Sequence, residues 1–293
     1  MITWLTAPLA YGFMQRGLLA SLMVGILCAV IGCYVVLRGM AFIGDALAHA
    51  ILPGIAIAYL LKGNLLIGAL AAAVLVALGI GFFSRQGTIK EDTAIGILFA
   101  AALSLGVLLI STIRTYAVDL THILFGNVLG VSTGDLRLTG ALTVLVLATI
   151  ALFYKEFLVI SFDPVLATTL RLPVEWLRYL MLILLALTVV VSLQTVGVGL
   201  VAAMLVTPGA TAYLLTRRLP TMMAVAALIG AFSSISGLYI SFYWNVASGA
   251  AVVLVATAIF LAAFLFAPQR GALWQWRRGR QQAVLAQCAE KEH

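Results

Sequence analysis

Apolar runs of roughly twenty residues, the length that crosses a bilayer as a helix, follow one another along almost the whole chain. Backbone amides inside lipid must be paired within their own segment, so continuous runs of this length are expected to be helices. Nine runs lie near residues 17–37, 41–61, 64–83, 94–112, 138–154, 179–196, 199–216, 221–243 and 247–267. Residues 179–216 could instead hold one span and a short broken helix. The sequence therefore predicts an all-α, polytopic membrane protein with eight or nine spans.

Composition and the flanking segments agree with this class. Hydrophobic residues make up 64% of the 293 residues and charged residues only 9%, which lies outside the range of soluble domains. We expect an amphipathic lead-in over residues 1–16, a transmembrane domain over 17–267 and a basic cytoplasmic tail over 268–293. The tail places Trp274 and Trp276 beside several arginines, a pattern typical of an anchor in lipid headgroups.

Basic residues between the spans predict the orientation, because positive charge is retained on the cytoplasmic side. With nine spans and the N-terminus outside, thirteen basic residues fall inside and only four outside, namely Arg16, Lys62, Arg114 and Arg137. The net charge of +7 is explained by this topology. No nucleic-acid partner is therefore expected.

Asp45 and His49 lie within the run over residues 41–61, and the other runs contain no acidic residue or histidine. Their i, i+4 spacing puts both on one face of a helix. An ionisable group in hydrocarbon is costly and usually functional, and a carboxylate with an imidazole suits manganese, zinc or iron. Pro53 cannot donate to the His49 carbonyl, which we expect to be free. The alternative is a buried polar pair that only packs helices.

Other polar residues are weaker candidates for contact with a metal ion. His122, in the outside segment 119–135, could capture metal at an entrance, or it could simply be solvated. Glu91 and Asp92 precede the fourth span, where acidic side chains favour the positive end of the helix dipole. We interpret them as helix-capping residues rather than metal ligands.

Two inside segments are candidate docking surfaces for a partner protein, since short helices with an exposed apolar side fit into partner grooves. In the first, Asp163 as N-cap and Pro164 at the first helical position predict a short helix. Its candidate contacts are Asp163, Pro164, Val165 and Leu166.

In the second segment, Pro208 and Gly209 are expected to break the preceding span and leave a short helix that Pro220 closes. Its candidate contacts are Ala210, Thr211, Tyr213, Leu214, Leu215, Arg217 and Arg218. For both segments the alternative is an ordinary connecting loop.

Five stretches together resemble one family: FMQRGLLASLMVG from Phe13, VLRGMAFIGDALAHAILPG from Val36, DLTHILFGNVLGVS from Asp119, ISFDPVLA from Ile160 and VGVGLVAAMLVTPGATAYLLTRRLP from Val196. They are similar to the ABC-3 family, the integral membrane permeases of ABC importers for manganese, zinc or iron. The resemblance covers about residues 5–267.

The resemblance implies a permease of a bacterial plasma membrane, the inner membrane in a Gram-negative cell, with a fold like that of type II ABC importers. It implies a second permease copy or relative, two cytoplasmic ATPase subunits and an extracytoplasmic metal-binding protein as partners. It also implies that Asp45 and His49 contact the transported metal, with no permanently bound cofactor. Residues 207–219 are similar in placement to the coupling helix of cobalamin-type importers, which makes them the first docking candidate.

We therefore expect a metal permease that works by alternating access and is not itself an enzyme. The chain contains no G-x-x-x-x-G-K-[ST] phosphate loop, so ATP hydrolysis would belong to another subunit. The main alternative is a stand-alone, proton-coupled secondary transporter, although no internal repeat presents a second broken, charged helix. An intramembrane metal hydrolase would need a further base or nucleophile, and none is evident.

Overall fold

The computed structural model describes residues 8–85, 89–112 and 130–267 of the chain. Apart from the short 3-10 helix η1 (Pro8–Ala10), the regular elements among these residues are α-helices. They are α2 (Gly12–Leu37), α3 (Ile43–Ala50), α4 (Leu52–Leu60), α5 (Leu65–Arg85), α6 (Glu91–Ser111), α8 (Thr133–Leu152), α9 (Tyr154–Phe162), α10 (Pro164–Thr169), α11 (Val174–Val196), α12 (Val198–Leu215), α13 (Leu219–Trp244) and α14 (Ser248–Phe266). The prediction of an all-α fold is confirmed.

Eight helices within the described residues are long and apolar enough to span a membrane: α2, the α3–α4 pair, α5, α6, α8, α11, α13 and α14. The remaining apolar helix, α12, is shorter by this measure. Only Gly197 separates it from α11, and Gly197 has a φ of 88°, a backbone region that glycine enters without steric cost. The choice between eight and nine spans therefore depends on whether α12 is counted, and α12 lies in the segment 179–216 where the sequence left the count open.

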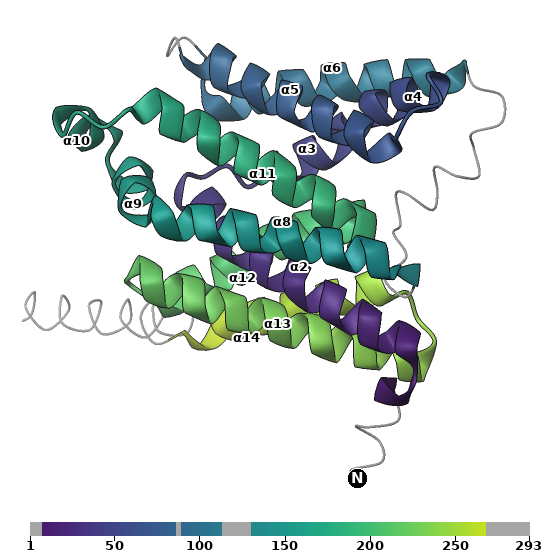
Figure 1. Cartoon of the computed structure of the whole chain (residues 1–293). Coiled ribbons are helices and arrows are strands. Elements are labelled where there is room, and N and C mark those ends of the chain that lie inside the picture. The colour runs from purple at the N-terminus through teal and green to yellow at the C-terminus, as the bar shows by residue number, and fades with distance from the viewer. Residues whose placement is uncertain (1–7, 86–88, 113–129, 268–293) are drawn as a thin grey trace, which may run out of the picture.

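Successive long helices run in opposite directions (Figure 1). The ends of α2 and α5 and the starts of α6 and α11 gather on the left of the view, together with α9 and α10. These are the ends that the basic residues predict to be cytoplasmic, and we call this side the inner end. His122 and the predicted cytoplasmic tail lie outside the described residues.

Helix α2 forms the centre of the bundle and is mostly buried along its length. It packs against α8, α11, α12 and α13. Small residues allow this close approach: a Cβ added to Gly25 would contact the Gly230 backbone of α13, and one added to Gly32 would overlap the Leu205 carbonyl of α12.

The α3–α4 span breaks at Ile51, two residues before Pro53. Proline cannot donate a backbone hydrogen bond, which explains the position of the break. The expectation that the His49 carbonyl is free is wrong, because it accepts a bond from the Ile51 amide.

The expected break at Pro208 and Gly209 is also wrong. Helix α12 continues through Pro208 to Leu215, because its neighbours hold the last turns in place. Gly209 lies against the Gly32 backbone of α2, and Thr211 and Ala212 are fully buried. Such packing offsets one missing backbone donor. Residues 210–215 are therefore the inner end of a long helix and not a separate short helix.

Candidate functional site

Asp45 and His49 occupy one face of α3, as their spacing predicted. The His49 Nε2 atom lies 3.6 Å from the Asp45 Oδ1 atom. The His49 side chain is 28% exposed and the Asp45 side chain 51% exposed. The histidine ring also lies 5.8 Å, between centroids, from the ring of Phe99 on α6. On a single chain, the pair therefore lies at the protein surface and not in the buried core.

A cavity of about 340 Å³ opens beside this pair. Its walls come from the start of α3 and the first turns of α6: Phe42, Asp45, Ala46, Asp92, Thr93, Ile95, Gly96 and Phe99. The sequence predicts only a helix-capping role for Asp92, and no local signal relates it to Asp45 because the two lie on different helices. The carboxylates of Asp45 and Asp92 thus border one cavity between α3 and α6 near the inner end, and His49 lies one turn further along α3.

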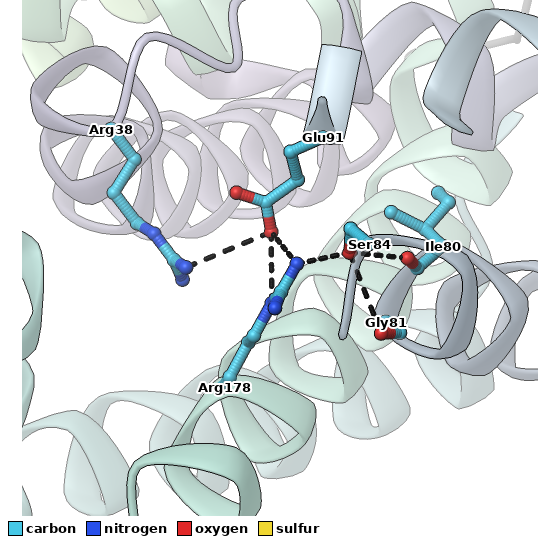
Figure 2. Close-up of polar contacts among 6 residues, drawn as sticks. All are labelled: Arg38, Ile80, Gly81, Ser84, Glu91 and Arg178. Atoms are coloured by element: carbon cyan, nitrogen blue, oxygen red, sulfur yellow. Dashed lines mark hydrogen bonds and ion pairs between the residues drawn. The ribbon is translucent and has the colours of Figure 1, made fainter. Parts of the chain in front are cut away.

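A second polar cluster joins four helices at the inner end (Figure 2). Glu91, in the first turn of α6, accepts a hydrogen bond from Nε of Arg178 on α11 at 3.1 Å, and the Nη2 atom of Arg178 forms an ion pair with the same oxygen, also at 3.1 Å. Arg38, which caps α2, places its Nη2 atom 3.6 Å from the same carboxylate oxygen. Arg178 also donates to the Ser84 hydroxyl on α5, which in turn donates to the Ile80 carbonyl. We call Arg38, Ser84, Glu91 and Arg178 the inner ion cluster.

The inner ion cluster is largely shielded from water. None of its three charged side chains is more than 22% exposed. Burial lowers the pKa of Arg38 from its usual value, while the adjacent Glu91 carboxylate acts in the opposite direction. The cluster borders a cavity of about 360 Å³ that also touches Lys90 and Pro164. Glu91 is therefore more than the helix-capping residue that its position in the sequence indicates.

The two predicted docking segments have different structures. Asp163 caps α10 by accepting from the amides of Val165 and Leu166, each at 3.0 Å, as the sequence predicted. Val165 is 75% exposed and Leu166 is 48% exposed. In the second segment Tyr213, Leu215, Arg217 and Arg218 are exposed, but they follow residues fixed inside the bundle.

Comparison with known proteins identifies the family. The ABC 3 transport family matches residues 10–267. The chain belongs to this family. It is 52% identical over 272 residues to the manganese transport system membrane protein MntC of Halalkalibacterium halodurans, covering 93% of each protein. It is 42% identical over 270 residues to a probable iron transport system membrane protein of Haemophilus influenzae, covering 92% of this chain and 99% of that protein.

A solved structure supports the same assignment. A chain of PsaBC from Streptococcus pneumoniae, in complex with Fab, aligns with a TM-score of 0.81 and 39% identity over 92% of this chain and 98% of that one. The ABC 3 chain is therefore a multi-pass protein of a bacterial plasma membrane and a permease component of an ABC importer. Within the described residues, no group of three or more His, Cys, Asp or Glu side chains is arranged to hold a metal ion.

Proposed function

We propose that this permease conducts divalent manganese, with ferrous iron as the second candidate, past Asp45 and His49. The observation that carries the proposal is the half-exposed carboxylate 3.6 Å from an imidazole inside an apolar span. The carboxylate supplies the charge that a dication requires, and the imidazole supplies a neutral nitrogen ligand. The names of the related manganese and iron proteins support the choice of metal.

A second permease, either a copy or a relative, covers the face that holds the pair. Asp45 is 51% exposed on a single chain, and a carboxylate facing lipid would be costly. A partner that presents the same face would enclose both pairs and raise the number of ligands from two to four. Such a site binds the ion without a full protein shell, which favours release during transport.

Helix α10 is the main docking surface for the cytoplasmic ATPase, and the inner end of α12 is the second. This order reverses the one that the resemblance favoured. Helix α10 is short, capped at Asp163 and exposes Val165 and Leu166, as expected of a helix that inserts into a partner groove. ATP-driven movement there would alternate access to the metal pair, and an extracytoplasmic protein would deliver the ion.

The test is manganese uptake by cells that lack their own importer and express this permease with its ATPase and binding protein. Replacing Asp45 by Asn preserves shape but removes the charge, so uptake should fall at least about tenfold, the scale of a lost charge-assisted contact. Asp135→Asn is the matched control, because Asp135 closes the capping box at the outer start of α8 and does not line the cavity beside Asp45. Equal uptake by the Asp45→Asn variant and the control, at equal membrane abundance, would refute the assignment.

A further inference from the structure

We propose that Glu91 is a positioning residue that transmits movement of the docking helix α10 to the Asp45–His49 pair. The inference rests on the proposed function, because it takes α10 as the ATPase-docking surface and the pair as the metal contact. It is carried by the inner ion cluster (Figure 2), in which Arg178 of α11, the helix after α10, contacts Glu91 at the start of α6.

Helix α10 is joined firmly to the start of α11. Arg171 adopts a left-handed conformation with φ of 56°, and its amide donates to the Thr168 carbonyl at 3.0 Å. The next amide, that of Leu172, donates to the Ala167 carbonyl at 3.1 Å. Pro173 then caps α11. These bonds close the end of α10 onto the connection, so a displacement of α10 reaches the first turns of α11.

Arg178 lies in the second turn of α11 and passes such a displacement to Glu91. Two of its nitrogen atoms contact one carboxylate oxygen at 3.1 Å. Arg38 holds the same oxygen from α2. A partly buried ion pair is screened much less than a surface pair, and removing one partner leaves an uncompensated charge. The contact between α11 and α6 therefore resists separation.

Glu91 is the first residue of α6, and the next residues of this helix line the cavity of about 340 Å³ beside Asp45, which we call the metal cavity. Asp92 and Thr93 face the same cavity as Asp45. Phe99, about 12 Å further along a helix that rises 1.5 Å per residue, contacts the His49 ring. A helix moves as a rigid unit over this length, so a shift at Glu91 alters the width of the cavity and the surroundings of His49.

The structure contains a matched control for the role of Glu91. Arg85 on α5 and Glu175 on α11 form another ion pair, with 2.8 Å between Nε and Oε1. Both side chains are more than half exposed, and exposed pairs contribute little. This pair bridges α5 and α11 but does not involve α6. Its loss should therefore leave the coupling intact.

The experiment reconstitutes the permease with its ATPase in proteoliposomes and measures manganese transported per ATP hydrolysed. Glu91→Gln should lower this ratio by about tenfold, within the usual range of coupling between sites. The ATPase should stay bound and active, and the KM for manganese should be unchanged because Glu91 does not line the metal cavity. Glu91→Asp, which keeps the charge but shortens the side chain, should give an intermediate ratio. Glu175→Gln should match the wild-type protein.

Three outcomes would overturn the proposal: a wild-type ratio in Glu91→Gln, an equal loss in Glu175→Gln, or a raised KM for manganese in Glu91→Gln. If Glu91→Gln does not fold, Glu91→Asp decides the question, and a wild-type ratio in that variant would refute the coupling role. A wild-type complex that accumulates no manganese would instead refute the proposed function, so the two failures are distinguishable.

Discussion

Asp45 and His49 share a face of α3 but have different surroundings. The imidazole lies against the Phe99 ring, which limits its orientation. The carboxylate is half exposed beside Asp92 in the cavity. On the proposed path, a metal ion would therefore meet a partly covered nitrogen ligand and a more exposed oxygen ligand. This combination favours passage of an ion over its permanent retention.

Gly32 lies at a close contact between the backbones of α2 and α12. Gly32→Ala should destabilise the protein by about 1–3 kcal/mol or more, as overpacked cores do, because the added Cβ would overlap the Leu205 carbonyl and not a movable side chain. Gly140→Ala in α8 is the control, since its Cβ would make only an ordinary contact with Met23, 3.7 Å from the sulfur. The measurement is the midpoint of thermal unfolding in detergent. Equal midpoints for the two variants would contradict this description of the α2–α12 crossing.

The candidate pair was predictable from the sequence because its two members lie one helical turn apart. Asp92 and Glu91 were placed correctly in the first turn of α6, but their partners were not predictable. The contacts of Glu91 with Arg38 and Arg178, like the approach of Asp92 to Asp45, depend on how separate helices pack. No local spacing encodes that packing.

At the scale of elements, the two docking segments show when a local signal is decisive. Asp163 and Pro164 specify the start of α10 by a cap and a fixed φ angle, and the helix forms as predicted. Pro208 removes only one donor, and the packing of Gly209 and Thr211 inside the bundle keeps α12 continuous. Proline therefore predicts a helix end less reliably within a packed transmembrane bundle.

This difference predicts which segment binds the ATPase. Replacing Val165 and Leu166 together by Asp should release the ATPase during purification in mild detergent, because the charges would have to be desolvated in the partner groove. The same change at Leu214 and Leu215 should weaken the association less. The measurement is the amount of ATPase that copurifies with equal amounts of folded permease. Release by the second pair alone would return the main docking role to the inner end of α12.

At the scale of the whole molecule, the order and direction of the helices follow from apolar runs and basic residues. These two signals do not show which helices pack against one another. The long helices are apolar on nearly all sides, so no single face identifies the side that packs. The position of α2 at the centre becomes evident only from its glycine contacts with α12 and α13. Helices α6, α8 and α14 bury few of their residues on a single chain, which leaves surface for lipid and for a second permease.

The most direct test of the central claim is manganese accumulation in proteoliposomes that contain this permease, its ATPase and its binding protein. ATP on the ATPase side should drive accumulation against a gradient, and Asp45→Asn should abolish it while the ATPase remains bound. A pH gradient alone should drive none. Accumulation driven by a pH gradient without ATP, or undiminished ATP-driven accumulation in Asp45→Asn, would contradict an ATP-driven pathway through Asp45 and His49.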